Sequence, residues 1–114
     1  MDAHDFVTVS ARREASPASV RSPEEALRGL LGSLVQALRE GGCTMVGHIK
    51  GMLEDGGPSP LFFSVTSLEA EPQIKGGPLA AQAGLTLSIT AIVAGIGEEE
   101  AARLLSGSLG EYLP

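Results

Sequence analysis

The clearest pattern in the chain is a series of apolar residues spaced three and four apart between residues 23 and 40. The residues on this face are Leu27, Leu30, Leu31, Leu34, Val35 and Leu38. The spacing predicts an amphipathic helix with one apolar stripe. Ser22 and Pro23 suit its N-cap and first position, and the two glycines after Glu40 end it.

Alternation of apolar and polar residues predicts three strands after this helix. In residues 43–54, one face takes Cys43, Met45, Ile49 and Leu53, and the other takes Thr44, His48, Lys50 and Glu54. Residues 61 to about 70 and residues 85–93 alternate in the same way, and residues 85–93 include many β-branched side chains. The Gly- and Pro-rich residues 55–60 join the first two strands as a hairpin. We expect an antiparallel meander.

The remaining segments are less regular. Residues 71–84 carry two prolines and three glycines, which predicts a surface excursion between strands, with some mobility. A second helix begins at Glu98, where three acids complement the helix dipole, and continues to Tyr112. Residues 1–21 are expected to be a partly flexible N-terminal segment with a short strand over residues 6–11.

These elements predict an α+β fold for residues 22–114, which form a single domain. Two helices lie on one face of an antiparallel sheet of three or four strands, in the order (β)αβββα, which makes a two-layer sandwich. The opposite face is then the informative surface. It would carry Thr44, Val46, His48, Lys50, Phe62, Ser64, Thr66, Thr86, Ser88, Thr90 and Ile92. So few charges favour an interface, although threonine also suits an ordinary solvated strand.

Composition and charge narrow the class of protein. The chain has 114 residues, of which 43% are hydrophobic, and a net charge of −6. The whole acidic excess lies in residues 54–114, which argues against nucleic acid because phosphate binding needs clustered Lys and Arg. Cys43 has no second cysteine to pair with, and residues 85–96 are too short an apolar run to span a bilayer. We expect a cytoplasmic protein with no membrane partner.

Two familiar motifs are incomplete. The order αβββα is that of double-stranded-RNA-binding domains, but Glu98–Glu100 would repel phosphate at the start of the last helix. Gly95 and Gly97 supply two glycines of a dinucleotide fingerprint, whereas Glu100 occupies the third position. A tight turn between strand and helix explains these glycines better, and no nucleotide cofactor is expected.

His48, in the middle of a strand beside Lys50, is the first candidate for a catalytic or metal-binding side chain. Cys43 has the opposite strand parity, so the two side chains should point to opposite faces and not share a metal. Hydroxyls at Ser64 and Ser88 lie on the same face, but no aspartate falls where it would orient the imidazole. We therefore assign no catalytic and no metal-binding residue.

Two short motifs carry a family resemblance. Gly47-His-Ile-Lys-Gly51, followed by Ser64-Val-Thr-Ser67, resembles the small C-terminal α+β appendage of cobalamin-synthesis-like P-loop GTPases of the metallochaperone kind. The resemblance covers about 55 residues. It implies an accessory domain that acts beside a GTPase on another chain, and nucleotide binding does not carry over because the GTPase domain is absent from this sequence.

The leading hypothesis is a module that self-associates or docks onto a protein through the hydroxyl-rich sheet face. The residues expected at this interface are Thr44, His48, Lys50, Phe62, Ser64, Thr66, Ser88 and Thr90. The alternative is a protein that binds an anionic metabolite with His48 and Lys50. An enzyme is the third possibility.

Overall fold

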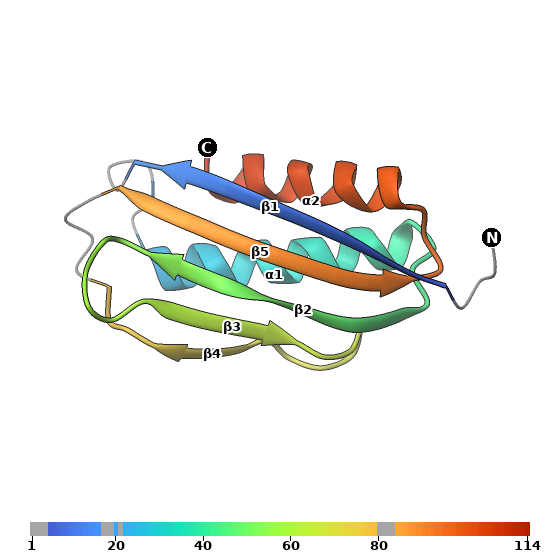
Figure 1. Ribbon diagram of the computed structural model, residues 1–114, viewed down its shortest axis with the longest axis horizontal. Helices are drawn as coiled ribbons and strands as arrows, with labels where there is room; N and C mark the ends of the chain where they lie inside the picture. Colours follow the sequence, from blue (N-terminus) through green and yellow to red (C-terminus); the bar gives the residue numbers. More distant parts are fainter. Residues whose placement is uncertain (1–4, 17–19, 21, 80–83) are drawn as a thin grey trace.

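The strands and helices follow one another in the order β1, α1, β2, β3, β4, β5, α2, and their bounds come from a computed structural model that describes residues 5–16, 20, 22–79 and 84–114. The bounds are β1 Phe6–Ala15, α1 Pro23–Glu40, β2 Met45–Glu54, β3 Leu61–Val65, β4 Gln73–Gly76, β5 Leu85–Ala94 and α2 Glu98–Tyr112. The strands form one antiparallel sheet in the order β1-β5-β2-β3-β4. Both helices cover the same face of this sheet (Figure 1).

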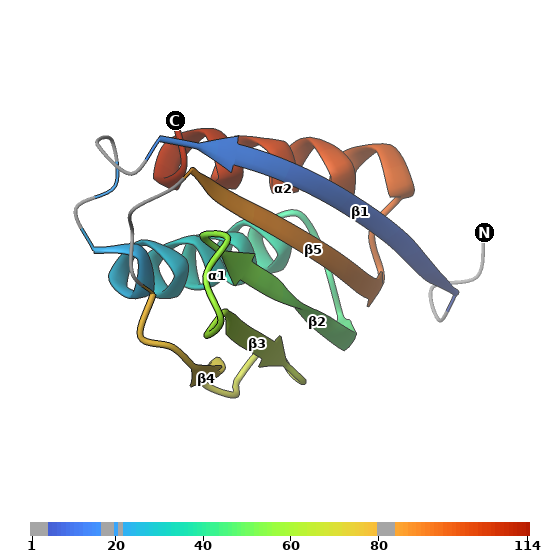
Figure 2. The same cartoon turned by 60° about the vertical axis from the view of Figure 1, so that its left-hand side comes forward.

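The leucine stripe of α1 is confirmed as the centre of the core. Leu27, Leu30, Leu31, Leu34 and Leu38 are all buried beneath the sheet. At its start, the Ser22 hydroxyl accepts a hydrogen bond from the Glu25 amide at 3.4 Å, which satisfies one of the otherwise free amides of the first turn. Figure 2 shows α1 behind β2 and α2 behind β1, so the other sheet face has no helix over it.

The expected simple meander is wrong, because β5 does not pair with its predecessor in the sequence. The strands β2, β3 and β4 do form a meander, and β5 then crosses back and inserts between β1 and β2. This arrangement makes β1-α1-β2 a split unit, since β1 and β2 run parallel with β5 between them. The central position of β5 accounts for its run of buried apolar residues.

The first strand is longer than expected. β1 continues past residue 11 to Ala15 and pairs with β5 over its whole length. Arg13 strengthens this edge because its Nε donates a hydrogen bond to the Leu113 carbonyl at 2.8 Å, which ties β1 to the end of α2. The flexibility expected for residues 1–4, 17–19 and 21 concerns positions outside the described residues.

The segment expected to be an excursion contains a strand. Residues 73–76 form β4, which pairs with β3 from Leu61 opposite Gly76 to Ser64 opposite Gln73. β3 in turn ends at Val65 and not near residue 70. Four residues are too few for alternation to reveal a strand, so the pairing partner decides this element. The mobility expected for residues 80–83 lies outside the described residues.

A β-bulge changes which side chains of β2 face the helices. The register with β5 shifts between Val46 and His48, where β2 advances by two residues while β5 advances by one. As a result Val46 is buried, with 5% exposure, whereas Met45 is 52% exposed. The sequence alternation predicts the reverse for both residues. Beyond the bulge the expected parity returns, and Ile49 and Leu53 are buried.

The two helices pack closely at one glycine. A Cβ on Gly29 would lie 2.5 Å from Cε1 of Tyr112, so the missing side chain of α1 makes room for the last residue of α2. Gly32, one turn further along α1, has no neighbour within 4 Å at that position. Of these two glycines of α1, Gly29 therefore has a packing role, whereas Gly32 has no neighbour to make room for among the described residues.

Candidate functional site

The face of the sheet opposite the helices is uncovered, and the strand register shows which side chains share it. Arg12 is paired with Ser88, Ser88 with Met52, Met52 with Phe62 and Phe62 with Lys75. Directly paired residues of antiparallel strands point to the same face. These five side chains therefore form one row across all five strands, which we call the Phe62 row.

A second row runs beside the first, two residues away along each strand. The members of this Lys50 row are Ser10, Thr90, Lys50, Ser64 and Gln73. The hydroxyls of Ser10 and Thr90 are hydrogen-bonded to each other at 2.9 Å. The middle of the open face thus combines hydroxyls with a central lysine.

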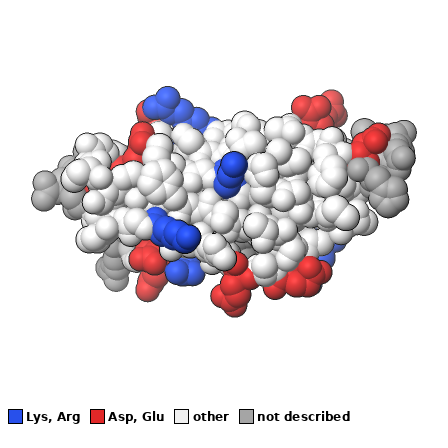
Figure 3. All heavy atoms as spheres, turned by 60° about the horizontal axis from the view of Figure 1, so that its bottom comes forward, with Lys and Arg blue, Asp and Glu red and all other residues white. Residues whose placement is uncertain are grey.

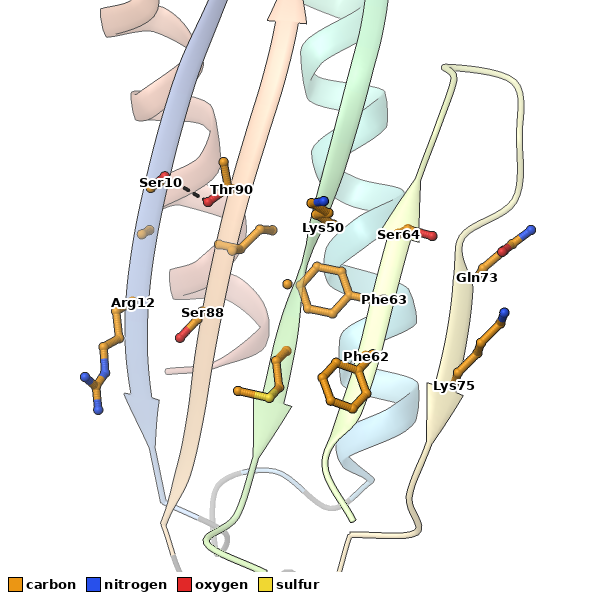
Figure 4. A pocket seen from close by; sticks show the side chains of 14 residues that line it. Ser10, Arg12, Lys50, Phe62, Phe63, Ser64, Gln73, Lys75, Ser88 and Thr90 are labelled. Atoms are coloured by element: carbon orange, nitrogen blue, oxygen red, sulfur yellow. Dashed lines mark hydrogen bonds between the residues drawn. The ribbon is translucent and has the colours of Figure 1, made fainter. Parts of the chain in front are cut away.

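The two rows line a shallow hollow of about 930 Å³ on the open face. Figure 4 shows Lys50 near the middle of the sheet, Arg12 on β1 at one margin and Lys75 on β4 at the other. Among the described residues that line the hollow, these three are the charged ones, and all are cationic. The hollow is therefore electropositive in a protein whose net charge is −6.

The floor of the hollow is apolar. Phe62 is 53% exposed and lies opposite Met52, so the two form an apolar contact surface between Lys50 and Lys75. Gly51, between Lys50 and Met52, also lines the hollow. An exposed aromatic ring beside a cation suits a ligand that is both apolar and negatively charged.

The remaining surface around this face carries little charge. Figure 3, turned so that the β3 and β4 side comes forward, shows a broad uncharged area with isolated cations in it and most carboxylates near its margin. A second apolar patch lies at one end of the open face, where Phe6 and Met45 both oppose Ala94. Both side chains are about half exposed, at 48% and 52%.

The structure brings together most of the residues expected at the interface. Lys50, Phe62, Ser64, Ser88 and Thr90 line the hollow. The other three expected residues lie elsewhere: His48, Thr44 and Thr66. His48 is half-buried opposite Ile92, outside the hollow, so it does not join Lys50 there.

Two of the expected residues, Thr44 and Thr66, lie outside the strands. Thr44 precedes β2, and its amide donates a hydrogen bond to the Ala94 carbonyl at 2.9 Å. Thr66 follows the last residue of β3 and is exposed. Val46, which was expected on the open face, is buried on the helix side as a consequence of the bulge.

Sequence reasoning missed the residues that the two edge strands contribute. Arg12 and Ser10 come from β1, and Gln73 and Lys75 come from β4. The alternation in Val-Thr-Val-Ser-Ala-Arg of residues 7–12 was a usable signal for a longer strand. No comparable signal marks the four residues of β4.

No metal centre is evident in the described part of the chain. Within residues 5–16, 20, 22–79 and 84–114, no three His, Cys, Asp or Glu side chains come together as metal ligands. In the same residues, every buried side-chain nitrogen or oxygen has a hydrogen-bond partner. Neither described helix has the length and apolar character to cross a membrane.

Cys43 is a buried free thiol beside the start of β2. It is 5% exposed, and its Sγ donates a hydrogen bond to the Met45 carbonyl at 3.4 Å. Burial raises the pKa of the thiol, and the backbone contacts oppose this only in part. The folded state therefore favours the neutral thiol more strongly than the unfolded state does.

This shift predicts a loss of stability in alkaline solution. A raised pKa means that the folded state binds more protons, so the free energy of unfolding falls as pH rises through the unfolded thiol pKa of about 8.5. Urea unfolding at pH 7 and pH 9.5 should show a larger loss for the wild type than for Cys43→Ala. Equal losses in the two proteins would contradict the assignment to this thiol.

Comparison with known proteins gives a likeness of fold alone. No family model matches the chain, and no curated protein matches it. Its fold is similar to that of a region of Zn(II)-bound YjiA GTPase from E. coli, with a TM-score of 0.50 and 19% identity. For a Zn(II)-bound triple mutant of YjiA GTPase, the TM-score is 0.53 and the sequence identity is 18%.

The likeness concerns only a part of those proteins. In both comparisons 90% of this chain is covered, but the chain spans only 29% of the other protein. At the level of fold, this agrees with the resemblance to a small α+β appendage of P-loop GTPases.

Proposed function

We propose that this chain is a protein-interaction module that docks onto a protein partner through the open face of its sheet. The observation that carries the proposal is the electropositive hollow on that face, with the half-exposed Phe62 on its floor. An apolar surface of this kind, rimmed by polar groups, is typical of an interaction site. The buried free thiol of Cys43 suits a chain that works in the reducing cytoplasm.

The composition of the central strand supports this proposal. The outward side chains of β5 are Thr86, Ser88, Thr90 and Ile92, none of which is charged. Threonine also suits a solvated strand, but a row of four uncharged positions on the open face equally suits a strand that a partner covers. Short hydroxyl side chains cost little conformational entropy when a partner covers them.

The fold similarity indicates a kind of partner to test, without identifying it. YjiA is a GTPase with bound zinc, and this chain matches about 29% of its length. We extend the proposal to an accessory role beside a GTPase domain, carried on another chain or on another part of the same protein. The open face would then be the contact surface.

Self-association through the open face is the less favourable form of this function. In a twofold dimer the same patch faces itself, so Arg12, Lys50 and Lys75 of one copy would approach the same cations of the other. Like charges brought together in this way weaken binding. Native mass spectrometry measures the oligomeric state directly.

Site-specific crosslinking tests the docking face. A photoreactive amino acid at Ser88, which is exposed on the open face, should crosslink to a defined protein in the native cell extract. The matched control is Ser106, which is exposed on α2 in the helix layer. We expect the crosslink from position 88 and not from position 106. Equal yields from the two positions, or none from either, would refute the proposed face.

A second candidate function is binding of a small anionic metabolite. The cationic hollow favours it, but only Lys50 of the two expected anchors lines that hollow. A ligand that binds the folded state raises its melting temperature. If citrate raises the melting temperature, and Lys50→Ala abolishes this rise whereas His48→Ala keeps it, metabolite binding is favoured over docking. Loss of the rise in both variants would show that His48 and Lys50 both bind the anion.

A further inference from the structure

We infer that the partner presents an acidic segment that crosses the sheet along the Phe62 and Lys50 rows. Its carboxylates would meet Arg12, Lys50 and Lys75, and an apolar side chain would rest on Phe62. This inference rests on the proposed docking function and names the chemistry of the partner. Its basis is the arrangement of charge on the open face.

The three cations are spread across the whole width of the sheet. Arg12 lies on the edge strand β1, Lys50 on the central strand β2 and Lys75 on the opposite edge β4. Neighbouring strands are about 4.8 Å apart. Lys50 is two strands from each of the others, so successive Cα positions are roughly 10 Å apart across the sheet, and the outer two roughly 19 Å.

This separation favours a segment over a single small anion. A compact anion placed at Lys50 would leave the positions of Arg12 and Lys75 roughly 10 Å away on either side. A chain with acidic groups at a similar interval meets all three cations together. In a polyproline II segment, which rises about 3.1 Å per residue with three residues per turn, every third residue faces the same way at an interval of about 9.3 Å.

The cations of the hollow have no carboxylate paired with them in the described part of the chain. The ion pairs there join Arg28 to Glu24 and Arg103 to Glu100 on the helices. None involves Arg12, Lys50 or Lys75. Their charge is thus available to an incoming acidic group.

Two acidic residues lie at one edge of the site. Glu14 on β1 and Glu54 on β2 are both paired with Thr86 on β5. They form the next row after the Phe62 row, on the side away from Lys50. They repel an acidic segment that shifts in this direction and so restrict it to the two rows of the hollow. Glu14 and Glu54 would also repel the phosphates of a nucleic acid. Among the described residues, three cations line the hollow, which is few for a polymer with a charge on every nucleotide.

A synthetic peptide tests this inference directly. The full chain, labelled with ¹⁵N, is titrated in low salt with the acetylated and amidated peptide Glu-Pro-Pro-Glu-Pro-Pro-Glu. We expect amide shifts for residues of the two rows, and weaker binding as salt is raised, because exposed charge pairs are screened. The peptide with Gln in place of Glu should bind at least several-fold more weakly.

Charge reversal identifies the cation that matters. Lys50→Glu should weaken peptide binding about tenfold, since it replaces an attraction with a repulsion at the centre of the site. Arg28→Glu is the matched control because it makes the same change of net charge on α1, where Arg28 is exposed and pairs with Glu24. The control should reduce binding less than twofold.

Several results would overturn the inference. These are the absence of shifts up to millimolar peptide, equal losses in Lys50→Glu and Arg28→Glu, or tighter binding of a thymidine heptanucleotide to the same rows. Citrate binding as tight as that of the peptide would also overturn it, in favour of a metabolite. If the peptide does not bind while the Ser88 crosslink persists, the docking function stands and only the acidic nature of the partner segment is refuted. Loss of both removes the docking function as well.

Discussion

Replacing Gly51 with alanine is expected to destabilise this domain by on the order of 3 kcal/mol or more. Gly51 lies in the central part of β2, paired with Ile89 on one side and Phe63 on the other. A Cβ at this position would stand 1.9 Å from the Ser88 carbonyl oxygen and 2.8 Å from Cζ of Phe63. The first neighbour is backbone in the middle of the sheet, so it cannot move aside without breaking strand pairing.

Urea unfolding monitored by circular dichroism measures this effect. The matched control is Gly32→Ala on α1, where the added methyl meets nothing within 4 Å. Alanine there should raise stability by about 0.5–1 kcal/mol, because glycine inside a helix is unfavourable. A Gly51→Ala protein as stable as the wild type would show that β2 and β5 are not packed as described.

A pair of glutamate substitutions should give the second large effect. Val46→Glu is expected to unfold the domain or to cost on the order of 4 kcal/mol, because it buries an unpaired carboxylate. Met45→Glu should change stability by less than about 0.5 kcal/mol, since that side chain is 52% exposed whereas Val46 is 5% exposed. The two variants add the same charge at adjacent positions.

Thermal melts of the two variants decide which face each residue occupies. The bulge between Val46 and His48 predicts that only Val46→Glu lowers the melting temperature strongly. Unbroken alternation from Cys43 to Leu53 predicts the opposite result, with Met45→Glu the damaging change. A protein that tolerates Val46→Glu and fails with Met45→Glu would therefore refute the bulge.

Gly51 is important for the fold and lies beside the candidate site. Its lack of a side chain allows β2 and β5 to pair closely, and its neighbours Lys50 and Met52 both line the hollow. The sequence pattern around Gly47 and Gly51 marks this strand as unusual, but it does not show which neighbour requires the glycine. That information needs the partner strand.

Much of the site was within reach of sequence reasoning. Lys50, Phe62, Ser64, Ser88 and Thr90 are at positions where strict alternation holds, and all of them line the hollow. The alternation fails where a bulge intervenes, as at Val46, and where a strand ends early, as before Thr66. Each of these failures has a cause outside the local segment.

The amino-acid sequence by itself determined α1, α2 and β5, because a helical or strand period is a local property that many residues report together. It also indicated that the outward positions of β5 carry no charge. Only the tertiary structure decided that β5 lies between β1 and β2, and that Arg12, Lys50 and Lys75 share one face. Strand order and register depend on contacts between residues far apart in the chain, and no local period records them.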